Sequence, residues 1–229
     1  MIRALIFDLD GTLADTEPLH FAAFCDILRR LGVALAHDEY FTRLIGFNDH
    51  DCLAAVLTER GIAHDEKMLT GLIAAKAGVY QAMIADQDVL YPGVMEFVRR
   101  CAERFPLSIA TGTLRAEAEM ILRRGQIREY FLDIVAAEDV ARGKPAPDGF
   151  LAALGRLGFI LRPRPSLSAG ECLVIEDTEA GVEAARRAGM RVLAVSHSPT
   201  AADLAGADVV RPSLAATDLD EVLRVLAAS

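Results

Sequence analysis

The chain has 229 residues, of which 52% are apolar and 25% are charged, a balance typical of globular proteins with a sizeable core. Its net charge of −9 and the absence of a Lys/Arg cluster argue against a nucleic-acid partner, because binding to phosphate backbones needs a basic surface. A small phosphorylated ligand stays compatible with this charge if a metal ion and local donors offset the repulsion. No leader and no bilayer-spanning run is found, so we expect a cytoplasmic monomer or weak homodimer without membrane contact.

Short apolar runs, many of them β-branched, predict six strands. In chain order they are Ala4–Phe7, Leu107–Ala110, Ile134–Ala136, Leu173–Ile175, Val192–Val195 and Val209–Val210. Helical patterns alternate with them near residues 94–104, 114–125, 149–157, 179–188 and 217–227. Because most of these runs are apolar on both faces, they favour a parallel sheet covered by helices. The order predicts the α/β class, with a Rossmann-like, doubly wound parallel sheet as its core.

One long segment interrupts this alternation with helical periodicity and no convincing strand. It predicts an all-helical cap domain at residues 16–90, inserted between core segments 1–15 and 91–229. We expect hinges for cap opening at 13–16 and 89–93. Since open parallel sheets bind ligands beyond the carboxyl ends of their strands, we expect the ligand in a crevice between core and cap.

The first helix of the predicted cap has a clear start signal. Thr16 is a suitable N-cap, and Glu17 and Pro18 suit the exposed amides of the first turn. One stripe of this helix is formed by His20, Phe24, Ile27 and Leu31.

Two further features receive no chemical role from the sequence. The cysteines have no paired short spacing, which predicts buried filler residues and neither a zinc site nor a disulfide framework: Cys25, Cys52, Cys101 and Cys172. The Pro-rich segment 159–171 is expected to form an irregular surface loop.

Polar residues capable of chemistry stand where predicted strands end. Asp8 and Asp10 follow the first strand, and Thr111 with Gly112 follows the second. Lys144 comes after a strand and loop, and Glu176 with Asp177 closes the strand at 173–175. The carboxyl ends of parallel strands share one edge of a sheet, so these groups are expected to converge.

The four acids of this set would repel one another in a partly buried cleft unless a cation or proton lay between them. Asp8, Asp10, Glu176 and Asp177 offer only oxygen ligands, which suit Mg²⁺. One carboxylate could then act as a nucleophile while its neighbour exchanges a proton. The Thr111 hydroxyl, nearby amides and the Lys144 ammonium would hold a transferring phosphoryl group.

Each of these residues also has a purely structural interpretation. Asp8 and Asp10 could form a turn, and Thr111 could cap a helix. Lys144 could be a solvated surface lysine, although Pro147 and Asp148 behind it suit a helix start. Asp177 is expected to be the N-cap of the helix at 179–188 under either interpretation.

Four segments together resemble the motifs of the haloacid dehalogenase superfamily, in order and across most of the chain. They are "DLDGT" at 8–12, "ATGT" at 110–113, "GKPAPD" at 143–148 and "VIEDTEAG" at 174–181. The resemblance implies a Rossmann-like core with a helical cap inserted after the first motif.

The resemblance also implies roles for single residues. Asp8 resembles the aspartyl nucleophile that becomes phosphorylated, and Asp10 the general acid/base. Thr111 and Lys144 resemble the phosphoryl-binding pair, with Gly112 permitting close approach. Asp8, the backbone carbonyl of Asp10, and Asp177 resemble the Mg²⁺ ligands, and Glu176 ligates the ion or orients a ligand.

Within the superfamily, the dehalogenase branch lacks the second aspartate, so Asp10 favours phosphoryl transfer. The preferred function is a Mg²⁺-dependent phosphatase for a small phosphorylated metabolite, such as a sugar phosphate or phosphoglycolate. The alternative is a β-phosphoglucomutase-like isomerase, and a catalytically silent metabolite-binding protein is a third reading.

Several residues of the predicted cap bear on this choice. His20 and Lys76 are similar to residues of the mutase cap, although His20 could equally be a plain helix-face residue and Lys76 a surface one. The mutase loop uses basic residues to hold a distal phosphate, whereas the segment 44–52 contains none and offers Asn48, Asp49 and His50. An Arg-phosphate fork is the usual grip on such a group, so hydrolysis is favoured.

Overall fold

The computed structural model describes residues 1–45, 47–85, 87–162, 166–196, 204 and 206–228. The chain divides into two compact units. The first contains Met1–Asp15 and Leu90–Ser229, and the second contains Thr16–Val89. Part of the Pro-rich segment expected as a loop, residues 163–165, lies outside the described residues.

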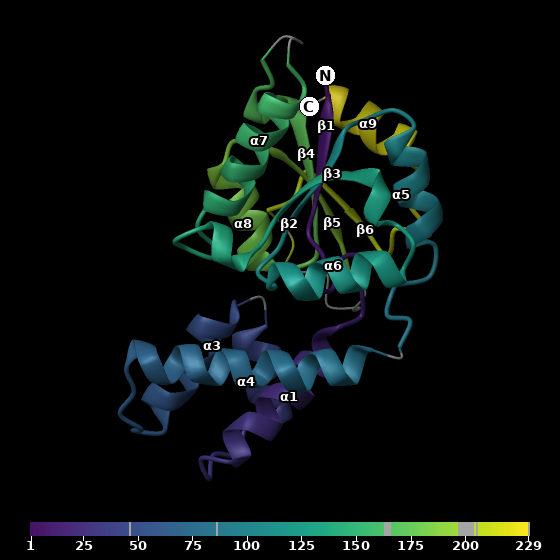
Figure 1. The fold of residues 1–229 in the computed structure, drawn as a ribbon. Coiled ribbons are helices and arrows are strands. Elements are labelled where there is room, and N and C mark those ends of the chain that lie inside the picture. Colours follow the sequence, from purple (N-terminus) through teal and green to yellow (C-terminus); the bar gives the residue numbers. More distant parts are fainter. Residues whose placement is uncertain (46, 86, 163–165, 197–203, 205, 229) are drawn as a thin grey trace. The chain divides into compact units, whose positions relative to one another are not determined.

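Within the described residues of the first unit, six strands form one sheet in which every pair is parallel (Figure 1). The order across the sheet is β3-β2-β1-β4-β5-β6. The strands are β1 (Ala4–Phe7), β2 (Leu107–Ala110), β3 (Phe131–Val135), β4 (Cys172–Glu176), β5 (Arg191–Val195) and β6 (Val209–Arg211). The predicted fold class, a doubly wound parallel sheet, is thereby confirmed, and β1 lies between β2 and β4.

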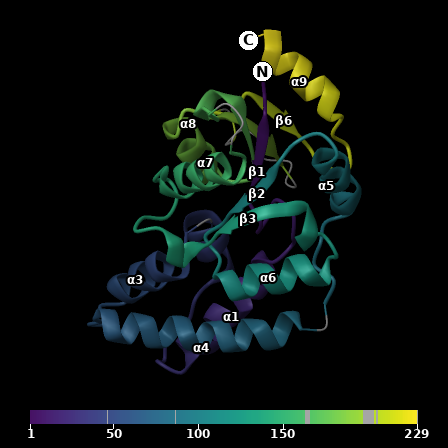
Figure 2. The ribbon, with the colours of Figure 1, turned by 45° about the horizontal axis from the view of Figure 1, so that its top comes forward.

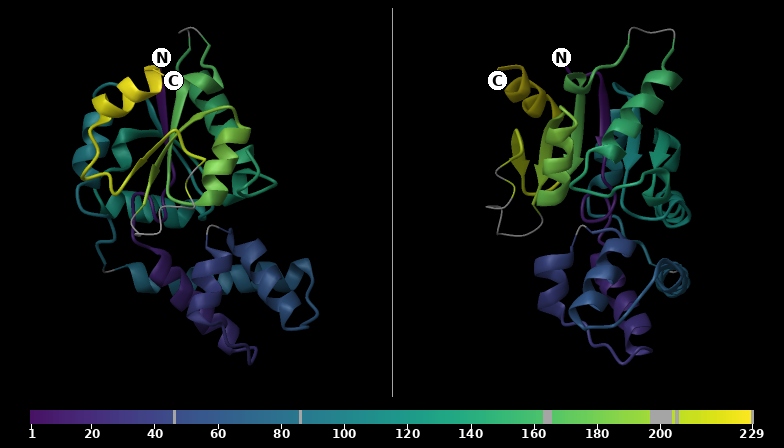
Figure 3. Two further views of the ribbon diagram at one scale, coloured as in Figure 1. Left: turned by 180° about the vertical axis from the view of Figure 1, so that it is seen from behind. Right: turned by 90° about the vertical axis from the view of Figure 1, so that its left-hand side faces the viewer.

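Helices cover both faces of this sheet, as Figure 3 shows from two further sides. They are α5 (Val94–Ala102), α6 (Arg115–Arg124), α7 (Asp148–Ile160), α8 (Glu179–Arg187) and α9 (Leu219–Ala228). Alternate residues of the strands, such as Ile6 and Val174, pack in one apolar cluster with α7 and α8. On the other face Phe7 meets Phe97 of α5 edge to face, with ring centroids 6.4 Å apart. Strands buried on both faces explain why their sequence is continuously apolar.

The second unit is helical, as Figure 2 shows. It has its own apolar core. Its elements are α1 (Glu17–Arg29), the short α2 (His37–Glu39), a π-helical turn (Tyr40–Leu44), α3 (Asp49–Glu59) and α4 (Glu66–Ile84). Phe24 and Ile27 of α1 pack with Leu53 and Val56 of α3 in this core. The longer helices α1, α3 and α4 thus each bury one face, as amphipathic helices do in a small bundle.

In the first unit, the predicted bounds of one strand and one helix differ clearly from the structure, and one predicted helix cap was wrong. β3 begins at Phe131 and ends before Ala136. Its start was missed because β3 is an edge strand in which Leu132 is exposed, so the first residues lack a continuous apolar pattern. Helix α7 runs to Ile160, three residues beyond its predicted end, with its last turn exposed. Asp177 does not cap α8: Thr178 holds that position, and its side chain accepts a hydrogen bond from the Gly181 amide.

The start of α1 also differs from prediction. Thr16 occupies the N-cap position, but its backbone has φ −106° and ψ −16°, and its side chain makes no capping hydrogen bond. An N-cap residue normally has extended backbone, which turns its oxygen toward the first amides. The helix ends at Arg29, so Leu31 lies beyond the buried stripe and is exposed.

Cys52, Cys101 and Cys172 are buried and free, as expected of filler residues, and the free Cys25 is partly exposed. Among the described residues, no helix combines the length and apolar character needed to cross a bilayer.

Candidate active site

The carboxyl ends of three adjacent strands bring the predicted site residues together. Phe7, the last residue of β1, pairs with Ile109 of β2 and Ile175 of β4. The backbone amide of Asp8 then donates to the carbonyl of Ile175 at 2.9 Å, which continues the ladder by one residue. Asp8 therefore leaves the sheet centre beside Thr111 on one side and Glu176 on the other.

Three acidic side chains form a cluster at this edge. Carboxylate oxygens of Asp8, Glu176 and Asp177 lie within 4.8 Å of one another. The Glu176 side chain is fully buried, and that of Asp8 is 7% exposed. Three converging carboxylates of this kind have the donor chemistry that a hard divalent cation such as Mg²⁺ prefers.

The pKa values of two of these acids reflect this crowding. Burial raises the pKa of Asp8 to about 8, with further increases from the charges of Glu176 and Asp10 and an opposing effect of Lys144. Burial also raises the pKa of Asp177, and the neighbouring charges of Glu176 and Asp8 add to the increase. Burial and the neighbouring acids thus disfavour the charged forms of both carboxyl groups, and a bound cation would offset this effect.

Lys144 is the cation that this cluster does contain. Its ammonium contacts both Asp8 and Glu176, and it lies 5.5 Å from the centre of the Phe150 ring. Burial opposes the charged form, but the two carboxylates outweigh it and raise the pKa of Lys144. The lysine is therefore held charged, in the position of a donor to a bound anion.

Close backbone approach is required at two glycines beside the acids. Gly11 has φ +78°, and a Cβ there would lie 2.1 Å from Asp177 Oδ2. A Cβ at Gly181 would lie 1.8 Å from Glu176 Oε1. Any side chain at either position would displace a carboxylate of the cluster, so the glycines of "DLDGT" and "TEAG" make room for it.

Hydroxyl and backbone amide groups donate hydrogen bonds to the carboxylates of Asp177 and Glu176. Thr12 donates to Asp177 Oδ1 at 2.7 Å. Glu176 Oε2 accepts from the amides of Asp177 at 2.7 Å and Thr178 at 2.8 Å, and from the Thr178 hydroxyl at 3.0 Å. These bonds orient the carboxylates before any ligand arrives.

Asp10 is held by the loop that follows β2. The hydroxyls of Thr111 and Thr113 both donate to its Oδ2, the former at 3.3 Å. Gly112, between the two threonines, is exposed. Asp8 and Asp10 thus stand in different surroundings: the first faces a lysine and two acids, and the second faces two hydroxyls.

The cap residues His20, Asn48 and Lys76, named from the sequence, lie within the helical unit. Lys76 is fully buried, so the surface interpretation was wrong; its Nζ lies 2.9 Å from Asp49 Oδ1 and 2.6 Å from His20 Nδ1. His20 stacks on Tyr80 with ring centroids 4.2 Å apart. Asn48 is the N-cap of α3 and accepts from the Asp51 amide at 2.9 Å.

Sequence reasoning missed three threonines that orient the acids: Thr12, Thr113 and Thr178. Each lies inside a segment that the sequence had singled out, one to three residues from the acid or hydroxyl that was chosen. The signal was a hydroxyl residue inside a motif at a sheet edge, where a buried carboxylate needs donors.

Comparison with known proteins places this arrangement in a family. The family model described as haloacid dehalogenase-like hydrolase matches residues 2–189. Protein CbbY of Rhodobacter capsulatus is 35% identical over 223 residues, covering 94% of this chain and 95% of that protein. The phosphorylated carbohydrates phosphatase of Thermotoga maritima is 32% identical, covering 86% of this chain and 87% of its own length. The β-phosphoglucomutase of Bacillus subtilis is 32% identical, covering 91% and 88%.

Solved structures agree with these sequence relatives. A β-phosphoglucomutase from Clostridium difficile has the same fold, with a TM-score of 0.88 at 21% identity, over 100% of this chain and 98% of that one. A CbbY variant from Rhodobacter sphaeroides, in complex with xylulose-(1,5)bisphosphate, gives 0.80 at 28% identity, over 94% and 96%. The chain therefore belongs to the haloacid dehalogenase-like hydrolase family.

Proposed function

We propose that this protein is a Mg²⁺-dependent phosphatase that hydrolyses a small phosphorylated metabolite through an aspartyl-phosphate on Asp8. The observation that carries the proposal is the pair of aspartates in unlike surroundings, Asp8 against Lys144 and Asp10 against two hydroxyls. Unlike environments let one carboxyl act as nucleophile while the other carries a proton.

In the first step, an Asp8 oxygen attacks phosphorus and the bond from phosphorus to the ester oxygen breaks. Asp10 gives its proton to that oxygen, so the alcohol leaves neutral. In the second step, water attacks the phosphorus of the aspartyl-phosphate and gives a proton to Asp10. The bond between phosphorus and Asp8 then breaks, which releases inorganic phosphate and restores both acids.

Phosphoryl oxygens need donors throughout these steps. Lys144 is held charged beside Asp8, where its ammonium can bind them, and Thr111 ends the neighbouring strand with its hydroxyl. Asp8, Asp177 and Glu176, with the carbonyl of Asp10, would hold the Mg²⁺ ion. When bound, the ion supplies charge that offsets the negative phosphoryl group and the carboxylates around it.

The substrate class we propose is a sugar monophosphate or a molecule of the phosphoglycolate type. Relatives named as a phosphorylated carbohydrates phosphatase and as CbbY support a phosphorylated sugar. The second candidate function is a mutase of the β-phosphoglucomutase type, because a relative of that name is 32% identical. The ion pair between Lys76 and Asp49 argues against a mutase. A lysine whose charge is balanced by an aspartate would bind a second phosphate group only weakly.

The test is phosphate release from a panel of phosphorylated metabolites and from p-nitrophenyl phosphate. We expect turnover that requires Mg²⁺ and falls by more than about a thousandfold in Asp8→Asn, since loss of a nucleophile removes the covalent route. Asp26→Asn removes an exposed acid that pairs with Arg30 and is the matched control. No Mg²⁺-dependent turnover of any phosphomonoester would refute the phosphatase, and faster conversion of β-glucose 1-phosphate to glucose 6-phosphate than to phosphate would favour the mutase.

A further inference from the structure

Thr113 contacts Asp10, the proposed general acid, although the two residues are far apart in the sequence. Its hydroxyl donates to Asp10 Oδ2, and the residue is 6% exposed. It stands two residues beyond Thr111, the residue that the family pattern assigns to phosphate binding. The buried hydroxyl of Thr113 therefore faces the acid and not the solvent.

Thr111 and Thr113 both contact Asp10, but their hydrogen bonds differ. The Thr111 hydroxyl accepts from the Thr113 amide at 3.0 Å and lies 3.3 Å from Asp10 Oδ2. A hydroxyl has one hydrogen to donate, so Thr111 cannot hold a phosphoryl oxygen and Asp10 at the same time. Once Thr111 turns to a phosphoryl group, Thr113 continues to hold the carboxyl group of Asp10.

The loop that carries Thr113 is held by hydrogen bonds at two of its residues. The carbonyl of Thr113 accepts from the Ala137 amide at 3.1 Å, in the turn that follows β3. Two residues later, the Arg115 amide donates to the Glu138 carboxylate at 3.1 Å. The threonine hydroxyl is thus presented from a segment bonded to the neighbouring strand end.

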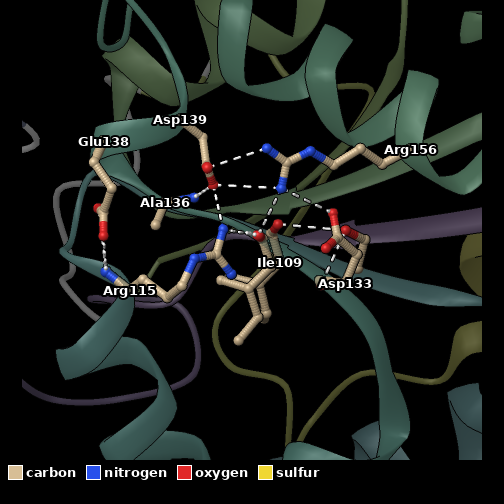
Figure 4. A network of polar contacts seen from close by, with 9 residues as sticks. Ile109, Arg115, Asp133, Ala136, Glu138, Asp139 and Arg156 are labelled. Carbon is tan, nitrogen blue, oxygen red and sulfur yellow. Dashed lines mark hydrogen bonds and ion pairs between the residues drawn. The ribbon is translucent and has the colours of Figure 1, made fainter.

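Figure 4 shows the polar network that holds this turn in place. The Arg115 side chain pairs with Asp139 and donates to the carbonyl of Ile134 at 2.8 Å. Asp139 also accepts from the Ala136 amide at 2.9 Å and pairs with Arg156 at 3.1 Å. Shared bonds of this kind limit the movement of the loop, so the donor is oriented before substrate binds.

We propose that Thr113 is a positioning residue: it fixes the rotation of the Asp10 carboxyl group so that the proton reaches the leaving oxygen. The inference rests on the proposed phosphatase function and deepens it. With Oδ2 fixed, the direction of Oδ1 follows from the plane of the carboxyl group. Proton delivery depends on such alignment, because a general acid must reach the oxygen at hydrogen-bond distance.

The test compares two esters that differ in their need for a proton. A sugar phosphate releases an alkoxide that must be protonated, whereas p-nitrophenyl phosphate releases a stable anion. We expect Thr113→Val to lower kcat/KM for the sugar phosphate on the order of tenfold to a hundredfold, part of what general acid catalysis contributes. The kcat/KM for p-nitrophenyl phosphate should change by less than about threefold. Thr113→Ser, which keeps the hydroxyl, should have values near those of the wild type for both esters.

Controls separate this role from a structural one. Asp10→Asn should show the same leaving-group pattern more strongly. Thr217→Val removes another buried hydroxyl, which donates to the Ser213 carbonyl at 2.7 Å, and should leave the ratio of the two kcat/KM values unchanged. That ratio does not depend on the fraction of folded enzyme, so a destabilised variant still gives an answer.

An equal fall for both esters, or no fall for either, would overturn the role of Thr113 and leave the phosphatase intact. A wild-type enzyme that hydrolyses neither ester with Mg²⁺ would overturn the proposed function and this inference with it.

Discussion

Lys144 of the core and Lys76 of the helical unit each contact carboxylate oxygens away from solvent, but their clusters differ in charge. Lys144 meets Asp8 and Glu176, with Asp177 beside them, so the acids outnumber the base. Among the described residues, Lys76 forms an ion pair with one acid, Asp49, and also contacts a histidine and aromatic rings. A cluster with surplus negative charge would be stabilised by a further cation, whereas a balanced one has its charges already paired, which supports a structural role for Lys76.

The largest effect that would separate the two lysines is on activity. Lys144→Met removes the ammonium that would bind phosphoryl oxygens, and we expect kcat/KM for phosphate esters to fall by about a hundredfold to a thousandfold. Arg142→Met, which removes an exposed cation paired with Asp148, is the control two residues away. Steady-state kinetics measure the difference, and a loss of less than tenfold would contradict the proposed role of Lys144.

An effect on stability is expected at the other lysine. Lys76→Met leaves Asp49 without its ion partner and should lower the free energy of unfolding by about 2–4 kcal/mol, somewhat less than a fully buried pair costs. Urea denaturation followed by circular dichroism measures it, with the exposed Lys67→Met on the same helix as control. Adding Asp49→Leu to this variant should recover part of the lost unfolding free energy. If Lys76→Met left the free energy of unfolding unchanged, the structural role of Lys76 would be refuted.

The smallest effect concerns pH and Mg²⁺. The pKa of Asp8 is raised from 3.8 to about 8 by burial, so the folded protein retains a proton that the unfolded chain has lost. The stability that this carboxyl contributes is therefore complete below about pH 4 and is lost as pH rises toward about 8. Bound Mg²⁺ replaces the proton and should restore it.

We accordingly expect Mg²⁺ to raise Tm by several degrees at pH 8 and by less at pH 6, at roughly 2–4 °C per kcal/mol for a chain of this size. Differential scanning calorimetry at both pH values measures the shift. In Asp8→Asn the difference between the two pH values should shrink, and an equal shift at both values in the wild type would contradict the cation site.

The sequence could predict the sheet and the identity of the acids, because both leave local signals. β1 is continuously apolar, β4 is apolar up to its last residue, and Asp8, Glu176 and Asp177 stand at the ends of these two strands. The burial of Lys76 could not be foreseen, because it depends on Asp49 and His20, which lie 27 and 56 residues away in the chain. The role of Thr113 was hidden for a related reason, since a hydroxyl signals nothing until the position of Asp10 is known.

The central place of β1 has a consequence for how the protein is made. The strand that leads into Asp8 and Asp10 is synthesised before both of its neighbours, β2 (Leu107–Ala110) and β4 (Cys172–Glu176). A nascent chain that ends before residue 172 presents an apolar strand with one edge unpaired, and it lacks Glu176 and Asp177 of the acidic cluster. Contacts of such long sequence separation form late, so the acidic cluster is complete only after these two residues have emerged.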